Sequence, residues 1–474
     1  MVNSMYKTLL EKIKTRSAKI CIVGLGYVGL PTAIFFAEKG FNVLGVVRNK
    51  KKINMINKGI SSIKDLNLDQ KLSKVVDNKM LSATADLKHA TEKSDIIISI
   101  VPTPVDEFKD PDLTPIISSG EEIAKGLGKG KLVILESTVY PGVTEEILQP
   151  ILEKSGLKAG LDFGLAYCPE RYNPGDKKHS IENVARIVGS ITPEWAEVTR
   201  QLYKTIINKD IKILRNIKTT EAAKVIENTQ RDLNIALMNE LAMIFERLDI
   251  DIMDVIGGAK TKWNFNVYYP GCGVGGHCLP VDPYYLVKKA KELGYHSKVI
   301  AAGRTINDNM PIHTLNLIQD ALNEHEKAVK NSKIVILGFS YKENVGDTRE
   351  SPALTLIKHL QWKGANVTVV DPYVEDTKNY GILETDLYRA LEGADVMVLM
   401  TCHDEFKLID FEKAKNLMKI PIIVDGRRIF TPDKLKNMGF SYKGIGAVNE
   451  VTAEVIPEMI SLQYYRTQKT KNGL

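Results

Sequence analysis

The stretch KICIVGLGYVGLPTAIFFAEKG (19–40) decides the first part of the fold. Its start, KICIV, is a short β-branched run typical of a buried strand, and LPTAIFFAEKG has apolar residues at helical spacing. Between them lie Gly24, Gly26 and Gly29. In a strand–turn–helix unit the first glycine allows the tight turn, the second lets the backbone approach a pyrophosphate, and the third packs helix on strand. The stretch therefore predicts a dinucleotide site, although a tight turn without a ligand has the same pattern.

The alternation of short strands and helical patterns continues in both halves of the chain. Up to about residue 212 the strand-like runs are NVLGVV (42–47), DIIISIVP (95–102), KLVILEST (131–138) and ARIVGS (185–190). A second series comprises KIVILGFSY (333–341), NVTVVDP (366–372), DVMVLMT (395–401) and PIIVDGR (421–427). Such a rhythm predicts βαβ units around a parallel sheet. The expected fold class is α/β, with two Rossmann-like parallel-sheet domains joined by a central helical domain.

The centre of the chain has a different pattern. Between Thr219 and Ile256 there is neither Gly nor Pro, and apolar residues recur at helical spacing. We therefore expect one long helix, which could join two domains and supply a dimer face. The predicted domains are a nucleotide-binding domain (1–212), a central helical domain (213–327) and a C-terminal domain (328–474).

The composition excludes several classes of protein. The chain has 474 residues, 44% of them hydrophobic and 26% charged, and a net charge of +6, which suits small anionic ligands but makes no case for nucleic acid. No apolar run approaches the roughly 18 residues of a membrane span, and the N-terminus lacks the apolar core of a signal peptide. The five scattered cysteines form no CxxC pair. We therefore expect no disulfide framework, no metal site and a cytoplasmic location.

The second strand departs from the usual cofactor pattern. NVLGVV ends at Val47, where an acidic residue would bind the adenosine ribose, and Arg48 follows. Arg48 could face a ribose 2′-phosphate, stack on the adenine or be solvated. We predict NAD rather than NADP. The C-terminal half lacks the glycine pattern, but Asp371 ends its second strand at the position of a ribose-binding acid, so this half could bind another nucleotide.

A second glycine-rich stretch, YYPGCGVGGHCLPVDPYYL (268–286), surrounds Cys278. Removal of one hydride from an alcohol gives an aldehyde. A thiolate that adds to this aldehyde creates a carbon from which a second hydride can leave, and water opens the resulting thioester. The alternative is a buried, inert cysteine, which the four nearby glycines disfavour because they offer little side chain to bury it. Asp282 is either the N-cap of the helix containing Pro283 or a carboxylate that handles protons near the thiol.

A polar stripe lies on the expected long helix. Lys224, Asn228 and Arg231 fall at i, i+4 and i+7, on one helical face. Such a stripe is either solvated or, next to an anionic sugar nucleotide, able to supply an ammonium and an amide to a developing alkoxide.

The ordered motifs of the chain resemble those of one family. The motifs are GLGYVGLP (24–31), VPTP (101–104), ESTVYPG (136–142), CPER (168–171), KVIENTQRDLNIALMNE (224–240), GGHCLPVDP (275–283), GFSYKENVGDTRESPA (338–353) and DGR (425–427). Over nearly its whole length the chain resembles the UDP-glucose/GDP-mannose dehydrogenases, which oxidise a nucleotide sugar at C6 with two NAD⁺. GGHCLPVDP, PERYNPGD (169–176) and TKWNF (261–265) are most similar to the branch that acts on UDP-N-acetylhexosamines.

The resemblance implies a role for each matching residue. Cys278 would be the nucleophile, and Lys224 and Asn228 would stabilise the oxyanion. Asp282 and Thr138 would order or activate water, and Glu170 would be the base in thioester hydrolysis. With the glycine turn and Arg48 included, the residues expected to contact NAD are Gly24, Gly26, Tyr27, Val28, Gly29, Arg48, Thr103, Thr138 and Arg349. Those expected to bind substrate are Glu170, Arg171, Lys224, Asn228, Arg231, Tyr269, Gly271, Lys342 and Arg427.

The implied activity is an NAD-dependent, four-electron oxidation of a UDP-N-acetylhexosamine to its 6-uronate for polysaccharide or glycan precursor synthesis. UDP-GlcNAc is the predicted substrate, and UDP-N-acetylmannosamine is the alternative within the family. The implied assembly is a homodimer or larger homo-oligomer that binds neither nucleic acid nor membrane. Two other classes remain open: a two-electron hydroxy-acid dehydrogenase, which also places a lysine on a long helix, and a non-catalytic nucleotide-binding module.

Overall fold

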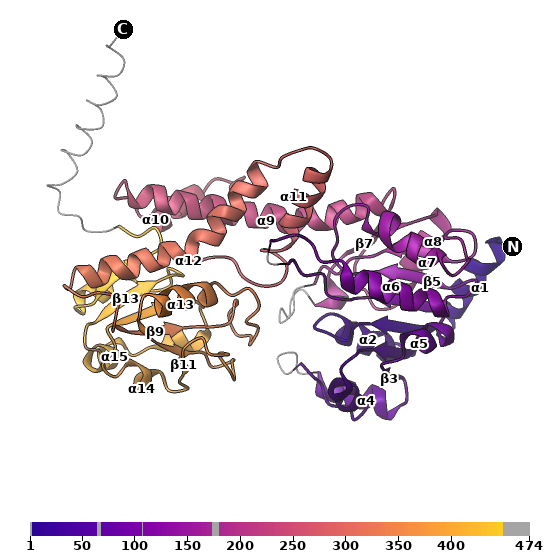
Figure 1. Cartoon of the computed structure of the whole chain (residues 1–474), viewed down its shortest axis with the longest axis horizontal. Helices are drawn as coiled ribbons and strands as arrows, with labels where there is room; N and C mark the ends of the chain where they lie inside the picture. Colours follow the sequence, from indigo (N-terminus) through magenta and orange to yellow (C-terminus); the bar gives the residue numbers. More distant parts are fainter. Residues whose placement is uncertain (1, 64–67, 107, 173–179, 449–474) are drawn as a thin grey trace, which may run out of the picture. The chain divides into compact units, whose positions relative to one another are not determined.

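The computed structural model describes residues 2–63, 68–106, 108–172 and 180–448 (Figure 1). They form two compact units. The first comprises Met1–Leu233 and Gly276–Arg304, and the second comprises Asn234–Gly275 and Thr305–Leu474. Helices α9 (Ile217–Glu246) and α12 (Val299–Asn323) contribute residues to both units.

The first unit contains an eight-stranded sheet of order β3-β2-β1-β4-β5-β6-β7-β8. Its strands are β1 (Lys19–Val23), β2 (Asn42–Val46), β3 (Leu81–Thr84), β4 (Ile96–Ser99), β5 (Leu132–Leu135), β6 (Gly164–Tyr167), β7 (Arg186–Ser190) and β8 (Ile211–Ile213). Its helices are α1 (Val2–Lys14), α2 (Gly29–Glu38), α3 (Lys50–Ile56), α4 (Asp69–Asp77), α5 (Leu87–Lys93), α6 (Thr114–Gly126), α7 (Gln149–Glu153), α8 (Pro193–Tyr203) and α11 (Asp282–Glu292), with a π-helix η2 (Val143–Leu148) and a 3₁₀ turn η3 (Ile181–Asn183). The order of the first six strands is that of a dinucleotide-binding fold, with its switch point between β1 and β4.

One pairing in this sheet differs from the expected parallel arrangement. β7 runs antiparallel to β6, through Ala166↔Ser190 and Tyr167↔Gly189, whereas the other strand pairs are parallel. The described residues between these two strands contain only the 3₁₀ turn η3, not the helix that a parallel connection ordinarily needs.

Alternate residues of each strand pack into different apolar layers. Ile20 and Ile22 of β1 belong to one cluster with α2 and α8, whereas Cys21 and Val23 belong to another with α6. Since side chains alternate across a strand, helices cover both faces of the first sheet.

The second unit repeats this architecture with six parallel strands of order β11-β10-β9-β12-β13-β14. The strands are β9 (Lys333–Leu337), β10 (Asn366–Val370), β11 (Ile382–Leu383), β12 (Val396–Leu399), β13 (Ile422–Asp425) and β14 (Ser441–Gly444). The helices are α10 (Ile252–Ala259), α13 (Pro352–Trp362), α14 (Leu387–Leu391), α15 (Phe411–Leu417) and α16 (Pro432–Asn437), with a 3₁₀ turn η4 (Asp404–Leu408). The predicted α/β class, with two such sheets and a helical region between them in the chain, is confirmed.

The long central helix is shorter than predicted. α9 ends at Glu246, and a second helix, α10, starts at Ile252. Asp249 in the connection has φ +54°, a left-handed conformation that a helix cannot continue through. The side chain of Asp251 then accepts a hydrogen bond from Met253 N at 2.8 Å and caps α10. The prediction of one helix from Thr219 to Ile256 was therefore wrong at its C-terminal end. Asp249 and Asp251 are residue types that also occur within helices, so the sequence did not mark the end of α9.

The described residues contain neither a membrane-spanning helix nor a cluster of metal-ligating side chains. Among the helices that the structure describes, none is long and apolar enough to cross a membrane. Within the same residues, His, Cys, Asp and Glu side chains form no group able to hold a metal ion.

Candidate active site

The glycine turn after β1 has the geometry that its sequence predicts. Gly24 has φ +97°, and a Cβ there would lie 2.4 Å from the carbonyl oxygen of Ile100. A Cβ on Gly29 would lie 1.8 Å from the carbonyl oxygen of Gly24, so only glycine allows α2 to start there. Gly26 is exposed, and a Cβ on it would meet nothing within 4 Å. The first and third glycines thus shape the turn, and the second leaves backbone exposed at the start of α2, as the predicted pyrophosphate site requires.

The two residues between Gly26 and Gly29 are held from both sides. The hydroxyl of Tyr172 donates to the carbonyl oxygen of Tyr27 at 2.6 Å, and Thr32 Oγ1 donates to that of Val28 at 2.9 Å. Tyr172 follows the CPER motif, so the chain after β6 supports the cofactor turn. Residues 173–176 of the PERYNPGD motif lie outside the described residues.

The neighbouring strand ends without a carboxylate. Val47 is half-buried and its amide donates to Thr84 O at 3.0 Å, while Arg48 is exposed. Asn49 caps α3, its Oδ1 accepting from Lys51 N at 2.9 Å and Lys52 N at 3.2 Å.

Three of the predicted catalytic residues meet in the first unit. Asn228 Nδ2 of α9 donates to Asp282 Oδ2 of α11 at 2.5 Å, although 54 positions separate the two residues. Lys224, one turn before Asn228, is buried at 7% exposure. Burial raises the pKa of Asp282 to about 6, and the Lys224 charge and the Asn228 hydrogen bond oppose that rise. Arg231, on the same helix, is exposed to solvent.

Cys278 lies four residues before this carboxylate in the chain. Its side chain is half-exposed, and its carbonyl oxygen accepts from Val281 N at 3.1 Å and Asp282 N at 2.8 Å. The N-cap residue of α11 is Val281, and Asp282 is the first residue of the helix. The interpretation of Asp282 as a simple N-cap was therefore wrong, because its carboxylate turns to Asn228 instead.

The glycines before Cys278 have a different role from the one predicted. In the second unit a Cβ on Gly271 would lie 2.9 Å from Arg427 Nη1, and one on Gly275 would lie 2.6 Å from Tyr341 Cβ. A Cβ on Gly273, where φ is +126°, would lie 3.0 Å from Pro352. These glycines admit close packing of other segments rather than leaving space around the thiol.

A tyrosine that sequence reasoning missed links two predicted loops to α11. The hydroxyl of Tyr285, one turn after Asp282, donates to Thr103 O, and Thr103 Oγ1 donates to Thr138 O at 2.9 Å. The VPTP and ESTVYPG motifs are therefore hydrogen-bonded to each other and to the helix that follows Cys278. Only the i, i+3 spacing from Asp282 could have indicated Tyr285.

A buried carboxylate also joins α9 to the ESTVYPG loop. Glu221, one turn before Lys224, accepts from Gly142 N at 2.6 Å and Thr144 N at 2.9 Å. These two contacts satisfy amides at the start of the π-helix η2. Burial raises the pKa of Glu221 to about 7, against the effect of these hydrogen bonds.

Glu170 belongs to a second buried cluster, whose other members the sequence did not indicate. Arg186 is fully buried and pairs with Glu170 and, at 3.1 Å, with Glu136. Glu170 Oε1 also accepts from the amides of Arg171, at 2.6 Å, and Tyr172, at 2.7 Å. Burial raises the pKa of Glu136 to about 7, although the Arg186 charge lowers it.

Arg171 turns away from this cluster. Its guanidinium pairs with Glu227 of α9 at 2.7 Å and donates to Ala185 O at 2.9 Å.

The predicted substrate residues of the second unit fall in two places. Arg427 Nε donates to Met400 O at 2.7 Å, and Gly271, close to this guanidinium, donates through its amide to Asn239 Oδ1 at 2.8 Å. Tyr269 is 52% exposed nearby in the chain. Arg349, predicted to contact NAD, forms an ion pair with Asp347 at 2.5 Å in this unit.

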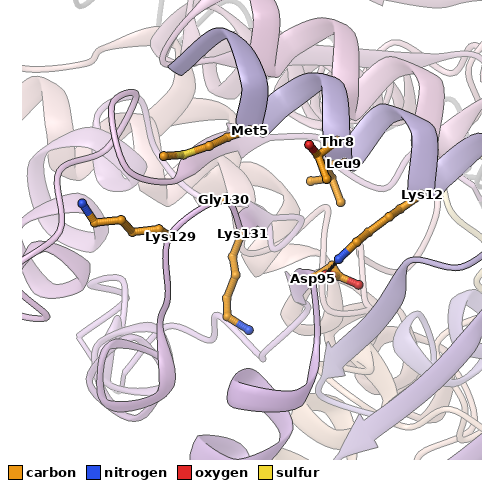
Figure 2. A pocket seen from close by; sticks show the side chains of 8 residues that line it. All are labelled: Met5, Thr8, Leu9, Lys12, Asp95, Lys129, Gly130 and Lys131. Carbon is orange, nitrogen blue, oxygen red and sulfur yellow. Dashed lines mark hydrogen bonds and ion pairs between the residues drawn. The ribbon is translucent and has the colours of Figure 1, made fainter. Parts of the chain in front are cut away.

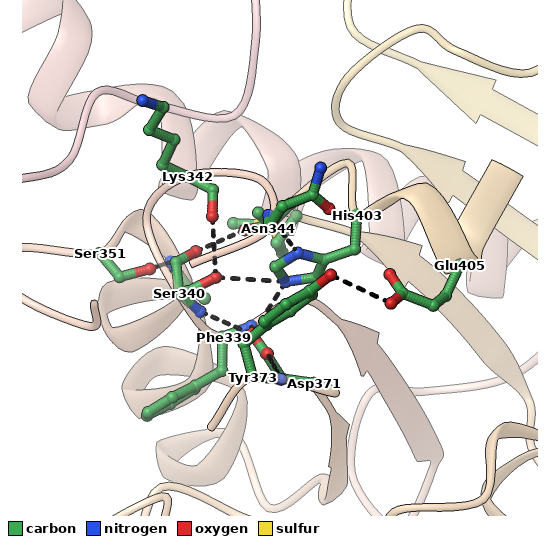
Figure 3. A network of polar contacts seen from close by, with 12 residues as sticks. Phe339, Ser340, Lys342, Asn344, Ser351, Asp371, Tyr373, His403 and Glu405 are labelled. Atoms are coloured by element: carbon green, nitrogen blue, oxygen red, sulfur yellow. Dashed lines mark hydrogen bonds and ion pairs between the residues drawn. The ribbon is translucent and has the colours of Figure 1, made fainter. Parts of the chain in front are cut away.

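Lys342 extends from a turn that a buried network holds (Figure 3). Asp371 Oδ2 accepts from Phe339 N at 2.7 Å and Ser340 N at 2.9 Å, and lies 3.1 Å from His403 Nε2. His403 Nδ1 accepts from Asn344 N at 2.9 Å, so Nε2 carries the proton. The Asp371 carboxylate lies at the position predicted for a ribose-binding acid, and here it accepts hydrogen bonds from backbone amides of the turn after β9. The Lys342 side chain points away from this network.

A cavity of about 290 Å³ lies apart from all of these residues, beside α1 (Figure 2). Its cations already have partners in the fold. Lys12 pairs with Asp95 at 2.6 Å, and Lys131 Nζ donates to carbonyl oxygens at the end of α5, including Thr91 O at 2.7 Å. Figure 2 shows no predicted site residue in this cavity.

The strand order, the open glycine turn and the Lys224–Asn228–Asp282 cluster define a dinucleotide-dependent dehydrogenase. Three family models match the chain: the NAD binding domain of the UDP-glucose/GDP-mannose dehydrogenase family at 18–207, its central domain at 218–309 and its UDP binding domain at 335–432. The chain therefore belongs to the UDP-glucose/GDP-mannose dehydrogenase family, and it is an NAD-dependent nucleotide-sugar dehydrogenase.

Similar proteins support this assignment over nearly the whole chain. The chain is 42% identical over 425 residues to UDP-N-acetyl-D-glucosamine 6-dehydrogenase of Pseudomonas aeruginosa, covering 88% of this chain and 99% of that relative. It is 36% identical over 428 residues to UDP-N-acetyl-D-mannosamine dehydrogenase of Pyrococcus horikoshii, covering 90% and 99% respectively. A solved structure of UDP-D-ManNAc dehydrogenase from Pyrococcus horikoshii matches with a TM-score of 0.84 and 36% identity, covering 90% of this chain and 99% of that one.

Proposed function

We propose that this protein oxidises the C6 hydroxymethyl group of a UDP-N-acetylhexosamine to a carboxylate in two steps on one cysteine. The balanced reaction takes the alcohol, water and two NAD⁺ to the uronate, two NADH and three protons. The meeting of Asn228 and Lys224 with Asp282, four residues after Cys278, carries the proposal. NAD⁺, when bound, supplies the chemistry of accepting a hydride from C6 in each oxidation.

Each residue of the cluster has a distinct task. The Cys278 thiolate adds to the aldehyde carbon, forming a C–S bond that places an oxygen and a removable hydride on one tetrahedral carbon. Lys224 and the Asn228 amide stabilise the negative oxygen that develops there.

The thioester formed by the second oxidation must then be hydrolysed. Since the pKa of Asp282 is about 6, its carboxylate is ionised at neutral pH and can accept a proton from water. Thr138 helps to order that water, and Glu170 is the second candidate base. The water oxygen binds the acyl carbon, the C–S bond breaks, and the thiolate of Cys278 is regenerated.

The remaining predicted residues bind the two ligands. The glycine turn with Tyr27, Val28, Thr103, Thr138 and Arg349 would hold NAD. Lys342, Arg427, Gly271 and Tyr269 would bind the UDP-sugar, together with Arg171 and Arg231. With the chain divided at 1–212, 213–327 and 328–474, most of the NAD contacts lie in the first segment and most of the UDP-sugar contacts in the other two, while Arg349 and Arg171 are the exceptions.

UDP-GlcNAc is the proposed sugar, because identity to the glucosamine relative exceeds identity to the mannosamine relative. Parallel assays of NADH release on UDP-GlcNAc, UDP-ManNAc, UDP-GalNAc and UDP-glucose test this choice, and a preference for UDP-ManNAc would replace it with the alternative.

Stoichiometry tests the mechanism. With limiting sugar, two NADH per sugar are expected. One NADH per sugar, with the aldehyde accumulating as the product of a two-electron oxidation, would refute the four-electron mechanism.

Variants of the cysteines test the role of the thiol. Cys278→Ser should abolish formation of the acid, whereas Cys402→Ser, which removes another half-exposed thiol, should not. Unchanged turnover of Cys278→Ser would favour a two-electron hydroxy-acid dehydrogenase. Tight NADH binding with no oxidation of any UDP-sugar would favour a non-catalytic module.

We also propose a homodimer or larger homo-oligomer in the cytoplasm. Ile226, Leu237 and Ile244 of α9 are 56%, 48% and 44% exposed and share one helical face, which suits a partner copy. All five cysteines are free thiols, as in a reducing compartment.

A further inference from the structure

The end of β2 lacks the group that ordinarily selects NAD. In dinucleotide-binding units an acid at this position binds the 2′-hydroxyl of the adenosine ribose. Here Val47 occupies it, half-buried and hydrogen-bonded only through its backbone to Thr84 O. A valine side chain can neither accept a hydrogen bond from the ribose hydroxyl nor repel a phosphate in its place.

The polar side chains on either side of this position cap neighbouring helices. Asn49 Oδ1 accepts from Lys51 N and Lys52 N at the start of α3. Asp86, the carboxylate that follows the adjacent strand β3, accepts from His89 N at 2.9 Å and caps α5. Both side chains are therefore held at helix starts by these cap hydrogen bonds.

Four cations follow Val47 within five residues: Arg48, Lys50, Lys51 and Lys52. Arg48, Lys50 and Lys51 are exposed, and no carboxylate among the described residues forms an ion pair with any of the four. An arginine can bind a phosphate through two parallel N–H donors, which a solvated lysine does not match.

We propose that the adenosine end of the cofactor site accepts a ribose 2′-phosphate, so that this enzyme binds NADP as well as NAD, with Arg48 as the residue that determines this specificity. The inference rests on the dinucleotide site of the proposed function but not on the identity of the sugar. It distinguishes this chain from dinucleotide-binding units in which an acidic residue at the end of the second strand selects NAD.

Binding of the reduced cofactors to the full-length protein tests the proposal without turnover. Fluorescence titration should give NADPH and NADH dissociation constants within about tenfold of each other. Arg48→Ala should weaken NADPH binding by about tenfold or more and NADH binding by less than about threefold. Arg48→Lys, which keeps the charge but not the fork, should fall between.

Two further variants complete the design. Arg215→Ala removes one exposed positive charge after β8, at the opposite edge of the sheet from β2, and should leave both constants unchanged. Val47→Asp should restore discrimination against NADPH. The ratio of kcat/KM for NAD and NADP with the oxidised UDP-sugar should follow the binding ratio.

The outcomes separate this proposal from the proposed function. Wild-type NADPH binding more than about a hundredfold weaker than NADH binding would overturn it, with NAD-dependent oxidation intact. Equal weakening of both cofactors by Arg48→Ala would also overturn it, since that result means stacking on the adenine. If the wild-type protein neither bound NADH nor oxidised a UDP-sugar, the dinucleotide site of the proposed function would itself be rejected.

Discussion

Arg186 offers the sharpest test of how the interior of the first unit is held together. Its guanidinium is fully buried between two carboxylates, donating to Glu136 Oε1 at 3.1 Å and pairing with Glu170. It also donates to Pro169 O at 3.0 Å and lies 5.2 Å from the centre of the Tyr203 ring. We expect Arg186→Met to leave two buried carboxylates facing each other without a counter-charge.

The cost follows from this geometry. Removing one member of a buried ion pair costs about 3–5 kcal/mol, because the remaining charge stays desolvated. Unfolding free energies of domains are about 5–15 kcal/mol, so a large share of the stability should be lost.

The loss should also depend on pH. Burial raises the pKa of Glu136 to about 7, and loss of Arg186 should raise it further. The folded state then holds a proton that the unfolded carboxyl releases near pH ~4.3. This proton linkage contributes its full stabilisation of the folded state below the pKa of the unfolded carboxyl. The contribution is lost as the pH rises through the pKa of the folded carboxyl. The destabilisation caused by Arg186→Met should therefore be greater at pH 8 than at pH 5.5.

Urea denaturation followed by tryptophan fluorescence measures this effect. Trp195 of α8 is 1% exposed, whereas Trp263 and Trp362 are 92% and 83% exposed, so the signal reports mainly on the first unit. Arg200→Met is the matched control, because Arg200 pairs with Glu197 at the surface and should lose less than about 1 kcal/mol. A loss below about 1 kcal/mol for Arg186→Met, or equal losses at both pH values, would refute the reasoning.

Three other results are expected. Gly26→Ala should keep the thermal stability, since its Cβ meets no protein atom, but should weaken NADH binding by about tenfold or more. Gly29→Ala should also lower Tm, because its Cβ clashes with Gly24 O. Equal Tm values for the two variants would contradict this reasoning. The log of kcat/KM should fall with unit slope below about pH 6, where Asp282 gains a proton, and Asp282→Asn should lack this limb; an unchanged profile in the variant would assign it to another group. Leu237→Glu should reduce the oligomer mass measured by light scattering, and an unchanged mass would exclude this face of α9 from the interface.

The sequence alone determined those features that depend on neighbours in the chain. The turn at 24–29 needs glycine for contacts within the same strand–turn–helix unit, so its spacing could be interpreted correctly. The alternation of β-branched runs and helical patterns likewise predicted both sheets, because each periodicity reflects the faces of one element. The α/β class and the NAD-dependent family followed from these local signals.

Tertiary structure alone decided which distant residues meet. Asn228 and Asp282 are 54 positions apart, Arg186 and Glu136 are 50 apart, and Tyr285 and Thr103 are 182 apart. Nothing in a local pattern marks a buried arginine as the partner of two carboxylates, because that partnership exists only after folding brings the three charges together in the interior. The antiparallel β7 and the end of α9 at Glu246 were missed for the same physical reason: strand direction and helix ends were settled by packing and capping, not by propensity.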